Sequence, residues 1–456
     1  MKKYQFVRLL AVVLATVLLV SACTSGGNNS GVNTGSQQGG GSSDPAGTSG
    51  NDKPFAGKEL NVLILKTAVW DELVTFKKEF EDATGMRVNF DSLPESAYFQ
   101  KLQLSLSTGN GEYDVVFANN KILGQMISGK WVEPLEEYVS REAGGSWDYD
   151  DFIPMLARNL HVEGHTYGLP MASESSILYY NKKLFEEAGL TAPPKTLDEL
   201  VEYAELLTKP EQEQYGIAMR ATREGGANGY AWIMLWKLLG GSWFEDGRPP
   251  YEILDTDTAI RAADYWNTLL SNYAPPGISS YGVNEVVLNF QQGKIAMMID
   301  ATTLGSRVEN PEESSVAGNV GYSVIEGIGE SHTVGPLWGI FMPSSSREKD
   351  AAWELMKWLS SKEIMLKQVE QKSRPDVTRT SVINSDAFKN NYNQEWAAAM
   401  EQALNHADFE YTPLIAQGQQ IRDLLAIALS KIISKQATVE DAMKEANAEV
   451  SKILAQ

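Results

Sequence analysis

The stretch Leu60-Asn-Val-Leu-Ile-Leu65 is a short and almost continuously apolar run, which is typical of a buried parallel strand. Apolar residues at helical spacing follow over 71–84, and a second strand is expected at 87–91. A helix at 97–107 and a third strand at 113–118 complete a strand–helix alternation. This order predicts an open α/β sheet, in which ligands bind beyond the carboxyl ends of the strands.

Polar residues follow two of these strands directly. Lys66 comes after the first strand, and Asn119 and Asn120 come after the third. Because the carboxyl ends of parallel strands share one edge of a sheet, we expect these three side chains to line a binding site.

The rest of the chain continues the alternation and predicts a second α/β lobe. Two capping boxes, Thr196 with Glu199 and Thr438 with Asp441, are expected to begin helices. Further strands are expected at 176–181, 294–300 and 336–340, and further helices at 182–188, 196–207, 351–359 and 438–454.

Composition excludes several classes of protein. The chain has 456 residues, of which 43% are hydrophobic, so it is long enough for two or three packed lobes. Its 59 acidic and 39 basic residues give a formal charge of -20, which argues against binding of nucleic acid or other polyanions. One cysteine and four histidines exclude a disulfide scaffold and leave little for a metal cluster.

The first 22 residues have the pattern of an export signal. Basic residues precede an apolar core at 9–20, which is shorter than the roughly 20 residues of a membrane span. Val20-Ser21-Ala22-Cys23 resembles the lipobox of bacterial lipoproteins, which implies that Cys23 is lipidated and anchors the chain to the membrane. The alternative is an ordinary secretory signal that ends near a cysteine. Residues 23–54 are rich in Gly, Ser and Asn, and we expect a flexible tether.

Six segments, in order along the chain, resemble the extracellular solute-binding proteins of ABC importers, in the carbohydrate-binding group that includes maltose-binding protein. The resemblance extends from about residue 58 to residue 454. The segments are Phe80-Glu-x-x-Thr84-Gly85, Tyr113-Asp-Val-Val, Tyr167-Gly-Leu-Pro with Tyr179-Tyr-Asn181-Lys, Phe290-Gln-Gln-Gly293-Lys294-Ile-Ala-Met, Ala351-Ala-Trp353-Glu-Leu, and Ala437-Thr438-Val439-Glu440-Asp441-Ala442.

The resemblance implies a two-lobe, periplasmic-binding-protein-like α/β fold with a ligand cleft between the lobes. The chain would cross between lobes three times, near 170–175, 336–341 and 373–377. The lobes would close around the ligand. They would comprise residues 55–171 with 340–373, and 172–339 with 374–456.

The resemblance also implies a function. The chain would bind a sugar or oligosaccharide outside the cell and deliver it to the permease of an ABC importer, as a monomer without cofactor or catalysis. It would be held on the outer face of the cell membrane. The long tether favours a Gram-positive surface, and a periplasmic site is the alternative. A secreted carbohydrate-active enzyme and a surface lipoprotein that binds glycan or peptide without transport are the alternatives.

Aromatic side chains are expected to stack on the sugar. The family often places such a residue near Tyr230 and Trp232, although an apolar helix that is buried all round would hide both. Trp338 lies on an expected crossing beside the cleft. Trp353 and Trp358, on an amphipathic helix, are expected to pack in the interior instead.

Polar side chains near the crossings complete the expected ligand site. Glu174 follows the first crossing and could accept hydrogen bonds from sugar hydroxyls; the alternative is a solvated loop acid. Asp300 ends a strand and would either face the cleft or cap the next turn. Arg374, at the third crossing, would either bind hydroxyl groups or pair the hinge with an acid.

Signatures of other chemistry are weak. His161-Val-Glu163-Gly-His165 has a spacing that could suggest a metal site, but in the family this segment is a variable hairpin, so no metal is expected. The body contains no H-E-x-x-H, Walker or G-x-S-x-G motif.

Overall fold

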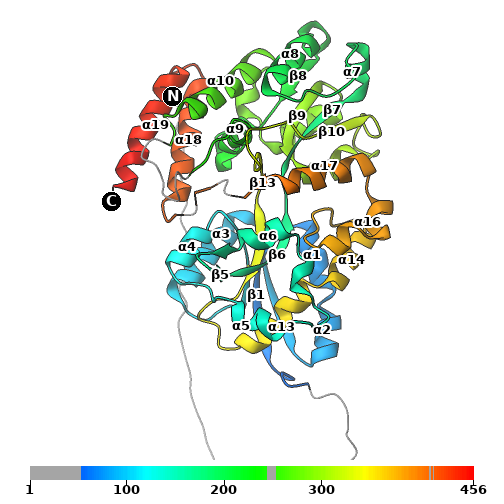
Figure 1. The fold of residues 1–456 in the computed structure, drawn as a ribbon, viewed down its shortest axis with the longest axis vertical. Coiled ribbons are helices and arrows are strands. Elements are labelled where there is room, and N and C mark those ends of the chain that lie inside the picture. Colours follow the sequence, from blue (N-terminus) through cyan, green and yellow to red (C-terminus); the bar gives the residue numbers. More distant parts are fainter. Residues whose placement is uncertain (1–52, 244–252, 410–411, 414, 456) are drawn as a thin grey trace, which may run out of the picture. The chain divides into compact units, whose positions relative to one another are not determined.

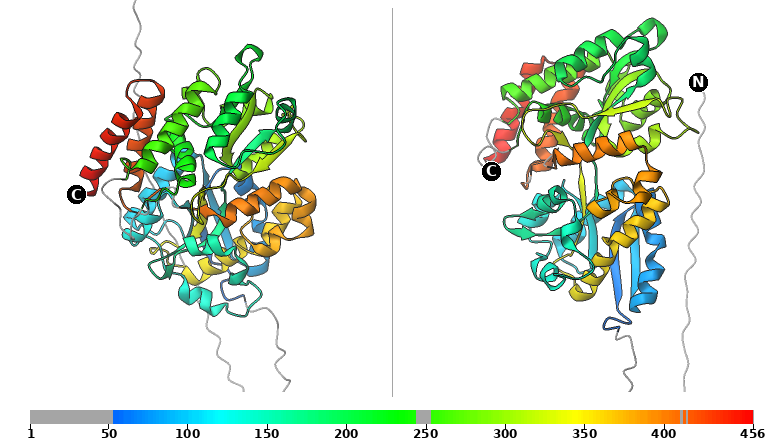
Figure 2. Two further views of the ribbon diagram at one scale, coloured as in Figure 1. Left: turned by 45° about the horizontal axis from the view of Figure 1, so that its top comes forward. Right: turned by 45° about the vertical axis from the view of Figure 1, so that its right-hand side comes forward.

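The structure is a computed structural model, and it describes residues 53–243, 253–409, 412–413 and 415–455. Within these residues, two separate main sheets form the framework of the fold (Figures 1 and 2). The expected signal peptide, Cys23 and nearly all of the expected tether lie outside the described residues. Within those ranges, no helix has the length and apolar character needed to span a membrane.

The first sheet has five strands in the order β2–β1–β3–β12–β6. β1 pairs in parallel with β2 and β3, whereas β12 runs antiparallel to β3 and β6. The three strands expected first along the chain are present, and β3 is buried along its whole length. The strands are β1 (Glu59–Leu65), β2 (Arg87–Leu93), β3 (Val115–Asn119), β6 (Gly168–Ser173) and β12 (Leu337–Phe341).

Helices pack around this sheet and form the first lobe with it. α3 contacts β1 and β2, α2 contacts β2, and α6 contacts β6. Apolar residues at helical spacing explain these contacts, since they give each helix one face to bury. The helices are α1 (Ala68–Thr75), α2 (Lys77–Thr84), α3 (Glu95–Thr108), α4 (Leu123–Ser128), α5 (Glu136–Arg141), α6 (Pro154–Asn159), α13 (Lys349–Leu359), α14 (Lys362–Glu370), α15 (Thr380–Ile383) and α16 (Asp386–Asn391).

The second sheet has four strands in the order β10–β7–β9–β8 and forms the second lobe with its helices. The strands are β7 (Ser176–Asn181), β8 (Tyr215–Ala218), β9 (Ile295–Ala301) and β10 (Val320–Ser323). The helices are α7 (Lys182–Glu187), α8 (Leu197–Leu207), α9 (Ala227–Leu238), α10 (Asp257–Asn272), α11 (Val283–Gln291), α12 (Gly305–Val308), α17 (Gln394–Asn405), α18 (Gly418–Ile433) and α19 (Val439–Leu454).

Both predicted capping boxes begin a helix of the second lobe. The Thr196 hydroxyl accepts a hydrogen bond from the Glu199 amide at 3.2 Å, and the Thr438 hydroxyl accepts one from the Asp441 amide at 3.1 Å. These bonds satisfy amides that have no partner inside the helix.

Two short pairings complete the strands. β4 (His161–Val162) and β5 (His165–Thr166) form a hairpin, so the His-Val-Glu-Gly-His segment is a turn. β11 (Thr333–Val334) pairs in parallel with β13 (Ala407–Asp408). Short 3₁₀ turns lie at 149–151, 210–212, 224–226, 278–280 and 302–304.

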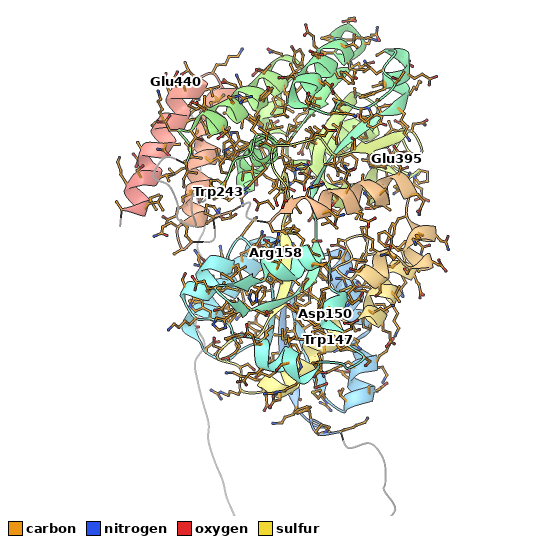
Figure 3. The ribbon with its side chains drawn as sticks, in the orientation of Figure 1. Trp147, Asp150, Arg158, Trp243, Glu395 and Glu440 are labelled. Carbon is orange, nitrogen blue, oxygen red and sulfur yellow. The ribbon has the colours of Figure 1, made fainter. Side chains whose placement is uncertain are left out.

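Tryptophans pack in both lobes; Figure 3 labels Trp147 in the first lobe and Trp243 in the second. In the second lobe Trp243 is fully buried and packs edge-on against Trp236. In the first lobe Trp147 packs edge-on against Trp353, while Trp358 lies against Phe80 with 5.4 Å between ring centroids. Trp353 is buried as expected, whereas Trp358 packs on Phe80 with its side chain only half-buried.

Two links between the lobes lie side by side. β6 belongs to the first sheet and β7 to the second, so Glu174 and Ser175 form the outgoing link. The return link is Gly335–Pro336, which joins β11 to β12. The Glu174 amide donates a hydrogen bond to the Pro336 carbonyl at 3.1 Å. A side chain at Gly335 would collide with the Glu174 carbonyl, so this position requires glycine.

The sheets assign a few residues differently from the lobe boundaries expected from the sequence. Residues 172–173 and 337–339 pair within the first sheet, although they were expected in the second lobe. The reason is that β6 and β12 are neighbouring strands of the first sheet. Their hydrogen-bonded pairing continues up to the links between the lobes.

The third passage also lies later than the expected crossing at 373–377. α15 and α16 pack against α14 in the first lobe, whereas α17 packs against β7 and β10 in the second. Arg379 holds the intervening segment to the first lobe, since its guanidinium donates to the Ser360 carbonyl and pairs with Asp151. The chain therefore passes to the second lobe between α16 and α17.

Candidate functional site

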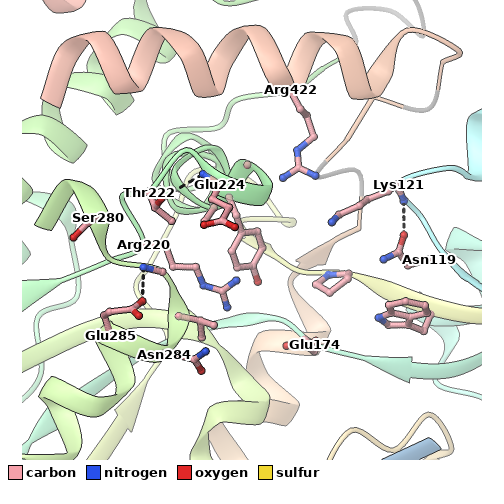
Figure 4. A pocket seen from close by; sticks show the side chains of 17 residues that line it. Asn119, Lys121, Glu174, Arg220, Thr222, Glu224, Ser280, Asn284, Glu285 and Arg422 are labelled. Carbon is pink, nitrogen blue, oxygen red and sulfur yellow. Dashed lines mark hydrogen bonds between the residues drawn. The ribbon is translucent and has the colours of Figure 1, made fainter. Parts of the chain in front are cut away.

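A cavity of about 510 Å³ is lined by residues of both lobes (Figure 4). The first lobe contributes the ends of β3 and β12, and the second contributes the segments after β8 and around α9, α11 and α18. The lining residues are Asn119, Lys121, Glu174, Arg220, Thr222, Glu224, Gly226, Ala227, Tyr230, Ser280, Gly282, Val283, Asn284, Glu285, Pro336, Trp338 and Arg422.

Arg220 is the most firmly positioned polar side chain of this cavity. β8 and β9 are parallel with Ala218 opposite Met298, and this register brings Arg220, two residues farther on, beside Asp300. The Arg220 Nε donates to Asp300 Oδ2 at 3.0 Å, and Nη2 donates to Oδ1 in a bidentate pair. Burial alone would lower the pKa of Arg220, but the neighbouring Asp300 carboxylate raises it, so the guanidinium stays charged.

Tyr230 supports the guanidinium from the second lobe. It projects from α9, and its ring centroid lies 4.8 Å from the Arg220 guanidinium carbon in a cation–π contact. The ion pair and the ring together fix the plane of the guanidinium, so that its remaining N–H groups have a defined direction.

Glu174 provides a carboxylate on the outgoing link. Its Oε2 accepts a hydrogen bond from the Thr303 hydroxyl at 2.8 Å. Burial raises the pKa of Glu174, and the Thr303 bond and the Arg220 charge offset only part of that rise. The group can accept hydrogen bonds from ligand hydroxyls while it is ionised.

Trp338 is the aromatic wall contributed by the first lobe. It lies on β12 opposite Asn119 of β3, and its ring is half-buried against Phe99 and Tyr98, with centroids 6.3 and 6.5 Å away. Asn119 beside it accepts a hydrogen bond from the Lys121 amide at 3.2 Å.

Four of the residues predicted from the sequence therefore line one cavity: Asn119, Glu174, Tyr230 and Trp338. The other five do not line it. Lys66 is exposed outside it because α1, capped by Thr67, begins almost directly after β1. Trp232 is fully buried in α9 and stacks on Trp236 at 5.0 Å.

Asn120, Asp300 and Arg374 are buried behind the site or beside it. The Asn120 side chain binds the backbone of Phe409 and Leu337. Asp300 is fully buried behind Arg220, so it does not face the cavity. Its carboxylate pairs with Arg220, so its role is not limited to capping the next turn. Arg374 is fully buried over the Trp70 ring and donates to the Gln368 side chain at 2.7 Å.

Sequence reasoning missed several lining residues, above all Arg220 and Arg422. β8 has only four residues and was not predicted, so nothing marked Arg220 as a residue at a strand end. Arg422 lies on α18 in a pattern that also suits an ordinary amphipathic helix. Among the residues that the structure describes, no group of three or more His, Cys, Asp or Glu side chains could hold a metal ion.

Comparison with known proteins relates this geometry to one family. Residues 67–365 match the sequence model of the bacterial extracellular solute-binding proteins. The mannitol-binding protein of Pseudomonas aeruginosa is 33% identical over 319 residues, which cover 68% of this chain and 71% of the relative.

Solved structures agree with the sequence comparison. A solute-binding protein of an ABC transporter from Agrobacterium vitis with bound D-mannitol has 27% identity and a TM-score of 0.73, over 87% of this chain and 98% of that one. Another from Agrobacterium radiobacter, in complex with ribitol, has 25% identity and a TM-score of 0.76, over 88% and 99%.

Proposed function

Because the chain belongs to the bacterial extracellular solute-binding proteins, we propose that it binds a small neutral polyhydroxylated solute, a sugar alcohol or a sugar, and delivers it to the permease of an ABC importer. The chain is a binding protein and not an enzyme, and it acts outside the cytoplasm. The carbohydrate-active enzyme considered above is therefore set aside.

The observation that carries the proposal is the placement of Arg220, Glu174 and Trp338 around one cavity. A planar guanidinium donates to hydroxyl oxygens, a carboxylate accepts from hydroxyl hydrogens, and an indole face covers C–H surface. A solute with a hydroxyl on nearly every carbon matches all three groups. The mannitol and ribitol carried by the similar proteins named above are solutes of this kind.

We also propose that the chain is a monomeric lipoprotein held by Cys23 on the outer face of the cell membrane, on a Gram-positive surface. The support is the lipobox-like sequence at 20–23 and the polar stretch that follows it. Replacement of Cys23 by serine should release the chain from the membrane fraction into the medium. An unchanged membrane fraction would contradict the anchor.

A titration of the exported Cys23→Ser chain tests the ligand class. The solutes are mannitol, ribitol, erythritol, common monosaccharides and maltose. At a ligand concentration a hundredfold above Kd, binding should add about 2.7 kcal/mol to the free energy of unfolding, which a thermal melt detects. Recovery of the ligand intact is expected. No stabilisation by any of these solutes would contradict the proposal.

Uptake tests delivery to the permease. Cells that lack the chain should lose uptake of the radiolabelled ligand, and the wild-type chain should restore it. A chain that binds the solute without affecting uptake would instead be the surface glycan-binding lipoprotein.

A further inference from the structure

We propose that Asp300 determines the charge selectivity of the cavity: by pairing with Arg220 it makes the site accept neutral polyols and reject the sugar acids with the same carbon chain. This inference rests on the proposed function, and it assigns Asp300 a positioning role in place of a direct contact with the ligand.

The geometry separates the two residues into a hidden and an accessible partner. Asp300 is fully buried and does not line the cavity, whereas the Arg220 side chain is 21% exposed and does. Both oxygens of Asp300 are engaged, since Oδ1 also accepts a hydrogen bond from the Ala301 amide at 2.7 Å. The carboxylate is therefore held by the end of β9 and cannot turn toward a ligand.

The pair with Asp300 leaves Arg220 with free donors but blocks one edge of its guanidinium to an anionic ligand. Asp300 occupies Nε and Nη2, which form one of the two edges that bind a carboxylate bidentately. Nη1 makes no hydrogen bond to the described residues, and the Arg220 side chain lines the cavity (Figure 4). A hydroxyl oxygen needs only one such donor, so a polyol loses little from the occupied edge.

The remaining charges of the cavity do not favour an anion either. Three cations line it, at Lys121, Arg220 and Arg422, and three carboxylates line it as well, at Glu174, Glu224 and Glu285. Asp300 behind Arg220 brings the formal sum of the site to minus one. Adding a ligand carboxylate to a partly buried site of that charge costs desolvation that no net positive charge offsets.

Neutralising Asp300 should weaken this preference for a neutral ligand. The Asp300→Asn side chain keeps the shape and can still accept from the Ala301 amide, but it leaves the Arg220 charge uncompensated beside the cavity. An acid should then gain affinity, while a polyol should gain none.

The test uses D-mannitol and D-mannonate, which differ in whether the terminal carbon is an alcohol or a carboxylate, and measures both dissociation constants by calorimetry on the Cys23→Ser chain. Wild type should bind mannonate about a hundredfold more weakly than mannitol. In Asp300→Asn, the ratio of the mannonate and mannitol dissociation constants should fall about tenfold or more, because mannonate binds more tightly. This gain in mannonate affinity should become smaller as salt is added.

Two variants serve as controls. Asp151→Asn removes the carboxylate of the Arg379–Asp151 pair, which lies in the first lobe outside the cavity, and should leave the ratio unchanged. The double variant Arg220→Gln, Asp300→Asn should show no gain for mannonate, because the exposed charge is gone.

The outcomes separate this inference from the proposed function. If wild type binds no polyol or sugar, the proposed function fails. If wild type binds mannitol but Asp300→Asn leaves the ratio unchanged, only the role of Asp300 fails. Equal wild-type affinity for mannitol and mannonate overturns the inference without any substitution, so the test does not depend on the folding of the variants.

Discussion

The side-chain amide of Asn120, at the end of β3 in the first lobe, donates a hydrogen bond to the backbone carbonyl of Phe409, beside β13 of the second. The same side chain accepts a hydrogen bond from the Leu337 amide at 3.3 Å. Asn120 is 5% exposed, so it connects parts of the chain and does not present its amide to a ligand.

Asn120→Ala should therefore destabilise the chain. The substitution leaves the Phe409 carbonyl and the Leu337 amide without these partners, which should lower the free energy of unfolding by about 1–3 kcal/mol in urea melts. Asn89→Ala, which removes an exposed asparagine from the same sheet, should have little effect. Lost ligand affinity at unchanged stability would instead support a direct contact, as the sequence suggested.

Trp338→Ala should weaken ligand binding by about 2 kcal/mol in calorimetry while the melting temperature changes little. The indole covers one wall of the cavity from the first lobe, and only its half-buried face contributes to packing. Trp358→Ala is the matched control, because Trp358 is also half-buried but packs on Phe80 outside the cavity. Similar losses in both variants would contradict a ligand contact by Trp338.

Arg220→Lys should weaken binding about tenfold or more, because an ammonium group cannot keep the bidentate pair with Asp300 and also direct a donor into the cavity. Arg379→Lys changes another buried Arg–Asp pair, in the first lobe, and should lower stability without lowering affinity. An Arg220→Lys chain with wild-type affinity would remove Arg220 from the ligand site.

Ligand affinity should fall as the pH is lowered from neutrality through the raised pKa of Glu174, because burial raises that pKa and the protonated group loses an acceptor. The sign for stability is opposite. A raised pKa means that the folded chain binds the proton more tightly than the unfolded one, so Glu174 adds stability at low pH and loses it as the pH rises through the raised pKa.

Glu174→Gln should remove the contribution of Glu174 to the pH dependence of ligand affinity and to that of stability, because the amide does not titrate. Glu224→Gln, at another carboxylate of the cavity, should keep the pH dependence of affinity. A Glu174→Gln chain whose affinity still falls with decreasing pH as in wild type would show that another group is responsible.

The sequence predicted the architecture because its signals are local. Apolar runs such as 60–65 and capping pairs such as Thr196 with Glu199 specify strands and helix starts within a few residues. The third passage between lobes was placed too early because the contacts that decide it, those of Arg379 with Ser360 and Asp151, join residues far apart in the chain.

The site was predictable only in part, for a similar reason. Tyr230 and Trp232 are two residues apart on α9, so they point in directions about 200° apart, and only one of them can face the cavity. Asp300 was assigned to the ligand because it ends a strand, but the parallel register of β8 and β9 places Arg220 in front of it. Such registers are set by the whole sheet and leave no mark in the local sequence.

The contact between the two links has a mechanical consequence. The backbone amide of Glu174 donates a hydrogen bond to the Pro336 carbonyl. Because Gly335 has no side chain, the two backbones can approach this closely. Because the links are joined in this way, we expect them to resist sliding past each other and to bend together, so that the lobes would rotate about a single axis. Trp338 is only two residues from Pro336, so we expect a ligand held against its ring to act close to that axis, where a small shift of the ligand would correspond to a large change in the angle between the lobes.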